Sequence, residues 1–141
     1  MRQEIVIALP PVFDRCVAAF GHEAIIGRPI VWSWGNKVFN PLGIEIPPEI
    51  LAHEKVHGER QSSDPVRINA WWDKYLTDAQ FRYDEELVAH RAEWHAYFRR
   101  RPGKDNTEVL NKIAERLASS LYGGCCTVAQ AKDAIQDWRT V

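Results

Sequence analysis

Signals that start helices recur through the last two thirds of this 141-residue chain, and they constrain its fold more than any other sequence feature. Asp64-Pro65 places an N-cap residue directly before a proline, a common opening of a helix. Three capping boxes, in which Thr or Asp is followed three residues later by Gln or Glu, occur at 77–80, 105–108 and 127–130. The sequence therefore predicts helices over 49–60, 66–76, 78–100, 105–121 and 127–138.

The first third of the chain has a different residue pattern. A short helix is predicted over 11–20, between a proline and a glycine. Ile30, Trp32 and Trp34 then recur at every second position, which is typical of a strand. Gly35-Asn36 offers a tight turn, so 37–39 can return as the second strand of a hairpin, and 44–46 suggests another extended piece. We therefore expect one α+β domain over 1–141, mostly helical, with a short β-hairpin.

Composition excludes several classes of function. The chain carries 18 Lys and Arg against 19 Asp and Glu, for a net charge of -1, whereas binders of nucleic acid or anionic membranes need a positive field. No apolar run approaches the roughly 18 residues of a membrane span, and the N-terminus does not resemble a signal peptide. Three cysteines, two of them adjacent, do not form a disulfide framework. We expect reduced thiols and a cytoplasmic protein.

One segment is a candidate functional motif: residues His53 to His57 have the pattern His-Glu-x-x-His. Residues four apart lie on one face of a helix, so both imidazoles can bind one metal ion. Glu54 lies one residue past the first histidine, where its carboxylate can accept a proton from a water activated by that metal. The motif predicts a zinc (Zn²⁺) site with His53 and His57 as ligands and Glu54 as general base.

A third protein ligand is expected from the long helix over 78–100, because catalytic zinc usually has three protein ligands and one open position. Glu86 is preferred, since Ala89 three residues later lets the two helices approach closely. His90 lies on the same stripe and is the second choice, as a ligand or as a hydrogen-bond partner of one. Glu85, Glu93 and the absence of a third protein ligand remain as alternatives.

His53-Glu54-x-x-His57 followed by Glu86-x-x-Ala89 resembles the glutamate-zincins, a class of zinc metallopeptidases. The segment 48–93 is similar to small metallopeptidase-like proteins of phages and prophages. The cues are Gln61, Trp71-Trp72 with Tyr75, Phe81-Arg82, and the run from Glu85 to Glu93. In the zincins Asp often follows the alanine, whereas this chain has His90 there. The resemblance implies a zincin-like fold with an edge strand and four further helices packed with the motif helix. It also implies metal ligands His53, His57 and Glu86.

In zincin architecture an extended edge strand pairs with a peptide substrate through main-chain hydrogen bonds. Residues 30–39 alone could supply such a strand here. Trp32 and Trp34 would then flank the substrate, unless they pack in the core.

The leading functional expectation is a zinc-dependent peptidase acting on a peptide or protein, in a host cytoplasm or a virion if phage-encoded. The alternative is a zinc-binding structural or assembly component of a phage particle, with virion proteins as partners and a closed site in which His90 or a cysteine is the fourth ligand. Glu54-x-x-His57 also fits half of a di-iron site, but the chain has no second Glu-x-x-His.

Overall fold

The computed structural model describes residues 2–101, 106–119, 122 and 124–137. The chain divides into two compact units, one made of residues 1–46 and 54–78 and the other of residues 47–53 and 79–141. Helix α3 (Pro48–Gln61) begins in the second unit and ends in the first. The single domain expected from chain length stays a prediction.

The first unit contains a three-stranded sheet in the order β1-β3-β2. Strand β2 (Trp32–Trp34) pairs antiparallel with β3 (Lys37–Phe39), which confirms the predicted hairpin. Its turn uses Gly35 at a φ of 58°, a conformation that favours glycine. Strand β1 (Glu4–Val6) pairs parallel with β3 and was not predicted. Residues 44–46, in contrast, form no strand.

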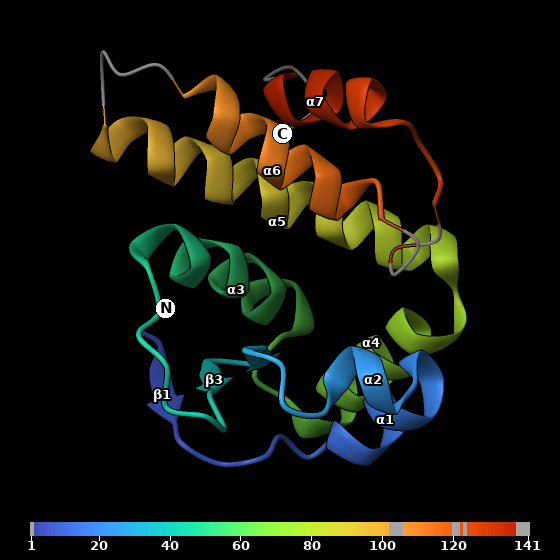
Figure 1. Ribbon diagram of the computed structural model, residues 1–141. Coiled ribbons are helices and arrows are strands. Elements are labelled where there is room, and N and C mark those ends of the chain that lie inside the picture. The colour runs from blue at the N-terminus through green and yellow to red at the C-terminus, as the bar shows by residue number, and fades with distance from the viewer. Residues whose placement is uncertain (1, 102–105, 120–121, 123, 138–141) are drawn as a thin grey trace. The chain divides into compact units, whose positions relative to one another are not determined.

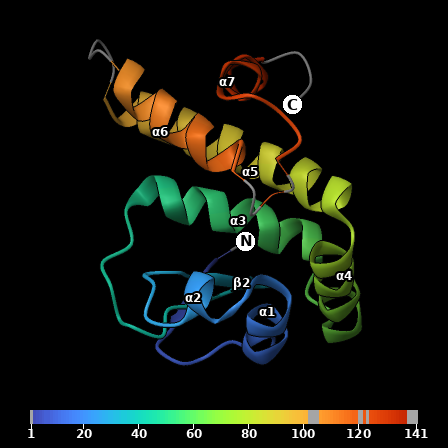
Figure 2. The same cartoon turned by 45° about the vertical axis from the view of Figure 1, so that its right-hand side comes forward.

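Three helices of the first unit are α1 (Phe13–Phe20), α2 (His22–Ile25) and α4 (Pro65–Thr77). Helices α1 and α4 contact each other (Figure 2), and Arg15 of α1 forms an ion pair of 2.7 Å with Asp73 of α4. The buried apolar side chains of this unit are contributed by the helices and by the hairpin: Val12, Cys16, Ile25, Trp32, Val38, Ile68, Trp71, Trp72 and Tyr75. Because Trp32 packs edge-on against Phe13, it belongs to the core.

The second unit is built from α5 (Ala79–Arg100), α6 (Thr107–Leu117) and α7 (Val128–Gln136), with the first turns of α3. Helices α6 and α7 contact each other, and both contact α5 (Figure 1). Their apolar faces form one cluster: Trp94, Leu110, Ile113, Ala114, Leu117, Ala131 and Ile135. Residues three and four apart dominate this set, as expected for helices that bury one face.

The predicted helix starts have different outcomes. The box at 127–130 is confirmed, since Thr127 and Gln130 cap each other reciprocally. Asp64 also caps α4 as predicted, with Pro65 next. At 77–80 the structure differs from the predicted helix start: α4 runs on to Thr77, whose hydroxyl donates to the Asp73 carbonyl, and α5 begins at Ala79.

At 105–108, Asp105 lies outside the described residues, and α6 begins after Asn106 without a side-chain cap. The predicted helix ends at Leu121 and Trp138 also lie outside them. The described part of the chain is mostly helical with a small sheet, as the α+β prediction requires. None of its helices is long and apolar enough to cross a membrane.

Candidate metal centre

The His-Glu-x-x-His motif lies within α3, as predicted, and the buried stripe of this helix is polar. His53, His57 and Gln61 are all buried and follow one another at intervals of four residues. Because α3 is one continuous helix, the two imidazoles occupy successive turns of the same face. The motif therefore has the helical geometry that shared metal binding requires.

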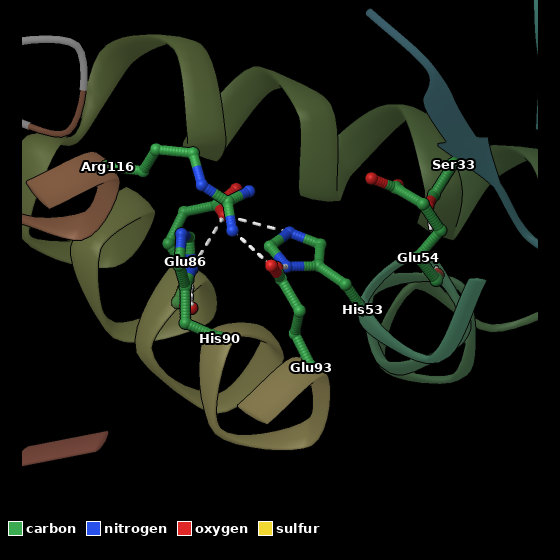
Figure 3. A network of polar contacts seen from close by, with 7 residues as sticks. All are labelled: Ser33, His53, Glu54, Glu86, His90, Glu93 and Arg116. Atoms are coloured by element: carbon green, nitrogen blue, oxygen red, sulfur yellow. Dashed lines mark hydrogen bonds and ion pairs between the residues drawn. The ribbon is translucent and has the colours of Figure 1, made fainter. Parts of the chain in front are cut away.

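Glu86 contacts the first of these histidines. Its Oε1 atom lies 3.2 Å from Nε2 of His53, and both side chains are buried (Figure 3). Ala89 is fully buried on the same helix, in keeping with the small residue expected at that position. The residue preferred as third ligand is thus adjacent to His53 Nε2, the nitrogen that a metal ion would use.

Glu93 faces the opposite nitrogen of His53. Nδ1 of His53 donates a hydrogen bond of 2.9 Å to Oε1 of Glu93, while Arg116 of α6 pairs with Oε2 of Glu93 (Figure 3). Burial by itself raises the pKa of Glu93, but the hydrogen bond from His53 and the charge of Arg116 outweigh it and lower the pKa to about 2. An ionised Glu93 keeps the proton of His53 on Nδ1 and directs Nε2 toward Glu86.

His90 contacts Glu86 through its Nδ1 atom. Its Nδ1 donates to the backbone carbonyl of Glu86 at 2.6 Å and lies 3.4 Å from Glu86 Oε1. Burial and the neighbouring His53 lower the pKa of His90 to about 4, so its imidazole is neutral at pH 7. With the proton on Nδ1, Nε2 carries a lone pair, and it has no hydrogen-bond partner among the described residues.

His57 is held by aromatic side chains of α4. Its ring meets Trp71 edge-on, with centroids 5.4 Å apart, and Tyr75 with centroids 6.4 Å apart. Trp71 and Tyr75 are themselves stacked at 4.9 Å. This packing limits the rotamers open to His57 and keeps its side chain buried.

Glu54, the predicted base, contacts strand β2. The hydroxyl of Ser33 donates to the Glu54 backbone carbonyl at 2.9 Å and also contacts Oε2 of the carboxylate (Figure 3). The Ser33 carbonyl in turn accepts hydrogen bonds from Gln61 Nε2 at 3.2 Å and Trp72 Nε1 at 3.1 Å. A peptide substrate therefore cannot use this carbonyl for the main-chain pairing that the zincin resemblance implies.

Buried histidine and glutamate side chains of this region could hold a metal ion. His53, His90 and Glu93 form one such group, with ligand atoms within 4.8 Å of one another. Of the predicted ligands, His53 and Glu86 lie in the second unit, and α3 carries His57 one turn after His53. Imidazole nitrogens with carboxylate oxygens suit several divalent transition metals, zinc among them.

Sequence reasoning missed the structural roles of three residues, although Gln61 was a cue for the resemblance. Arg116 gave no signal, because its partner Glu93 lies on another helix, 23 residues away in the sequence. Ser33 and Gln61 had a weak one: Ser33 alternates with two tryptophans, and Gln61 continues the spacing of His53 and His57. No protein-family model, curated protein or solved structure matches the chain, so similarity to known proteins adds nothing to these observations.

Proposed function

We propose that this chain is a zinc-dependent peptidase with His53, His57 and Glu86 as metal ligands and Glu54 as general base. The observation that carries the proposal is the environment of His53. Glu86 lies at its Nε2 and Glu93 accepts a hydrogen bond from its Nδ1, while Glu54 is the next residue of the same helix. This is how a metal-ligating histidine is oriented by a carboxylate in other metalloproteins.

The donor set fits zinc. Two imidazoles and one carboxylate give three protein ligands, the number found in catalytic zinc sites that keep an open position. A bound zinc ion supplies Lewis acidity, which polarises a scissile carbonyl and lowers the pKa of a water molecule toward neutrality.

The chain's own residues divide the remaining work. Glu54 accepts a proton from the attacking water and later gives it to the leaving amine. Glu93 and His90 hold His53 and Glu86 in their orientations, and Trp71 and Tyr75 hold His57. A carboxylate directly after the first metal-binding histidine is what water activation requires.

The test separates metal binding from hydrolysis. Glu54→Gln should keep its zinc and its fold but lose about 10²- to 10⁴-fold in cleavage of an internally quenched peptide library. Glu59→Gln is the matched control, since Glu59 is an exposed glutamate of the same helix, 3.9 Å from Lys55. Glu86→Gln should weaken zinc affinity much more than Glu85→Gln.

If the fully zinc-loaded wild type cleaves no peptide, or if Glu54→Gln cleaves as fast as wild type, the peptidase proposal fails. Equal effects at Glu86 and Glu85 would remove Glu86 from the ligand set.

A second candidate is a non-catalytic zinc site, and one observation favours it. The lone pair of His90 Nε2 is buried and has no hydrogen-bond partner among the described residues, so His90 is available as a fourth ligand. Four protein ligands close a zinc site to substrate. In that case His90→Ala should weaken zinc affinity as strongly as His57→Ala.

A further inference from the structure

We propose that Ser33 is a positioning residue for Glu54: its hydroxyl holds the general base in the orientation used for proton transfer. The inference rests on the proposed peptidase function. Ser33 is only 3% exposed, and its hydroxyl contacts both the backbone carbonyl and the carboxylate of Glu54 (Figure 3). One serine thus contacts α3 at two points of the residue on which catalysis is proposed to depend.

Ser33 is itself fixed in place. It is the middle residue of β2 and pairs with Val38 of β3. Its carbonyl accepts two hydrogen bonds, from Gln61 and from Trp72. The Gln61 side chain also accepts a hydrogen bond of 2.8 Å from the Gly35 amide, so it joins α3 to the hairpin at two neighbouring residues. The hydroxyl therefore projects from a rigid part of the hairpin.

Hydroxyl chemistry suits this role. A glutamate side chain has three rotatable bonds, and a general base must lie within about 2.6–3.2 Å of the proton that it removes. A hydroxyl can donate to a carboxylate and can accept from a carboxylic acid. The contact with Ser33 can therefore persist before and after Glu54 takes a proton, and the side chain need not reorient during turnover.

Two kinds of substitution at Ser33 give opposite expectations. Ser33→Ala removes the hydroxyl, and Ser33→Cys keeps the volume but replaces it with a weak donor. Both should lower kcat by about 10- to 100-fold, as expected when a catalytic group is misplaced, with little change in KM or in zinc affinity. Ser33→Thr keeps the hydroxyl and should retain most of the activity. Ser63→Ala, at an exposed serine, is the matched control.

The experiment uses the zinc-loaded full chain and two readouts. The first is kcat and KM for one internally quenched peptide that the wild type cleaves. The second does not need turnover: acetohydroxamate binds zinc through oxygen and offers a proton to a neighbouring carboxylate, and its affinity is measured by calorimetry. Wild type, Ser33→Thr and Ser63→Ala should bind it equally, whereas Ser33→Ala, Ser33→Cys and Glu54→Gln should bind it several-fold more weakly.

The outcomes distinguish the two proposals. If the wild type cleaves peptides and both Ser33→Ala and Ser33→Cys match it in kcat and in acetohydroxamate affinity, the role of Ser33 is refuted and the peptidase proposal stands. If the wild type cleaves nothing, the peptidase proposal fails, whatever the hydroxamate affinities. A general loss of zinc or of circular dichroism in the Ser33→Cys and Ser33→Thr proteins alike would make Ser33 a structural residue and overturn its positioning role.

Discussion

Replacing Glu93 with glutamine tests the residues that orient the proposed metal ligands. Glutamine has nearly the same size and keeps an oxygen that can accept the hydrogen bond from His53 Nδ1. It removes the negative charge, however, and with it the ion pair to Arg116. Glu93→Gln therefore isolates the electrostatic contribution of this carboxylate to metal binding.

The expected magnitude follows from the geometry. Mutation of a residue that orients a metal-ligating histidine weakens metal affinity by about 10- to 100-fold. Here the Glu93 side chain is 3% exposed and its hydrogen bond to His53 measures 2.9 Å, so water screens the interaction little. The variant also leaves the charge of Arg116 uncompensated close to a bound cation. We therefore expect the upper end of the range, about 100-fold, or roughly 2.7 kcal/mol.

Glu93→Gln should also change the acid sensitivity of the metal-free protein. A carboxyl whose pKa falls from 4.5 to about 2 on folding stabilises the folded state above pH 4.5, and this stabilisation is lost as the pH falls toward 2. The shift corresponds to roughly 3 kcal/mol. Glutamine does not titrate, so the free energy of unfolding of Glu93→Gln should fall less than that of wild type as the pH is lowered.

Zinc affinity is measured by competition with a chromophoric chelator at pH 7.4, and stability by urea unfolding of the chelator-treated protein between pH 7 and pH 3. Glu115→Gln is the control, because it removes the same charge from an exposed position of α6. A folded Glu93→Gln protein whose zinc dissociation constant lies within twofold of wild type would refute the orienting role of Glu93.

Two further predictions concern stability. Burial and His53 lower the pKa of His90 from 6.5 to about 4, so the unfolded chain takes up a proton there first as the pH falls. Between pH 7 and pH 5, protonation linked to His90 should therefore lower the free energy of unfolding of metal-free wild type by about 2 kcal/mol. In urea titrations His90→Phe should lose less over this range, and equal losses in the two proteins would contradict the prediction. Gln61→Met removes the buried acceptor of the Gly35 amide and one of the two donors to the Ser33 carbonyl. The free energy of unfolding in urea should fall by about 2–4 kcal/mol, whereas Gln80→Met, at an exposed position, should change it little.

Local sequence patterns were sufficient to predict the elements that are determined by residues close together in the chain. The hairpin follows from alternation around Gly35-Asn36, and the start of α7 follows from Thr127 and Gln130. The proximity of Glu86 to His53 followed from spacing and a small residue at position 89. The hairpin and the start of α7 rest on chemistry within one strand pair or one turn, whereas the contact of Glu86 with His53 joins two helices and was expected from the motif pattern.

Features that depend on distant contacts were not predictable in the same way. Strand β1 exists because Glu4–Val6 pairs with Lys37–Phe39, and nothing within a three-residue segment specifies a partner so far along the chain. Thr77 matched a capping pattern, but with only Asp78 between α4 and α5 its hydroxyl bonds back to α4. Arg116 shows the same limit, since the burial of Glu93 selects its partner and burial is a tertiary property.

The Gln61 carboxamide has a consequence for the solubility of the chain. A side-chain amide has both N–H donors and a carbonyl acceptor, as a peptide group has one of each, and Gln61 presents both kinds of atom to the hairpin, at Ser33 and at Gly35. Strand β2 stands at one end of the strand order, where unpaired main-chain groups invite another chain to add on. Gln61 and Trp72 occupy those positions in place of a fourth strand. The last turn of α3 thus protects the edge of the hairpin from pairing with another chain. In a chain in which that turn has not yet formed, this strand edge is unpaired and open to aggregation.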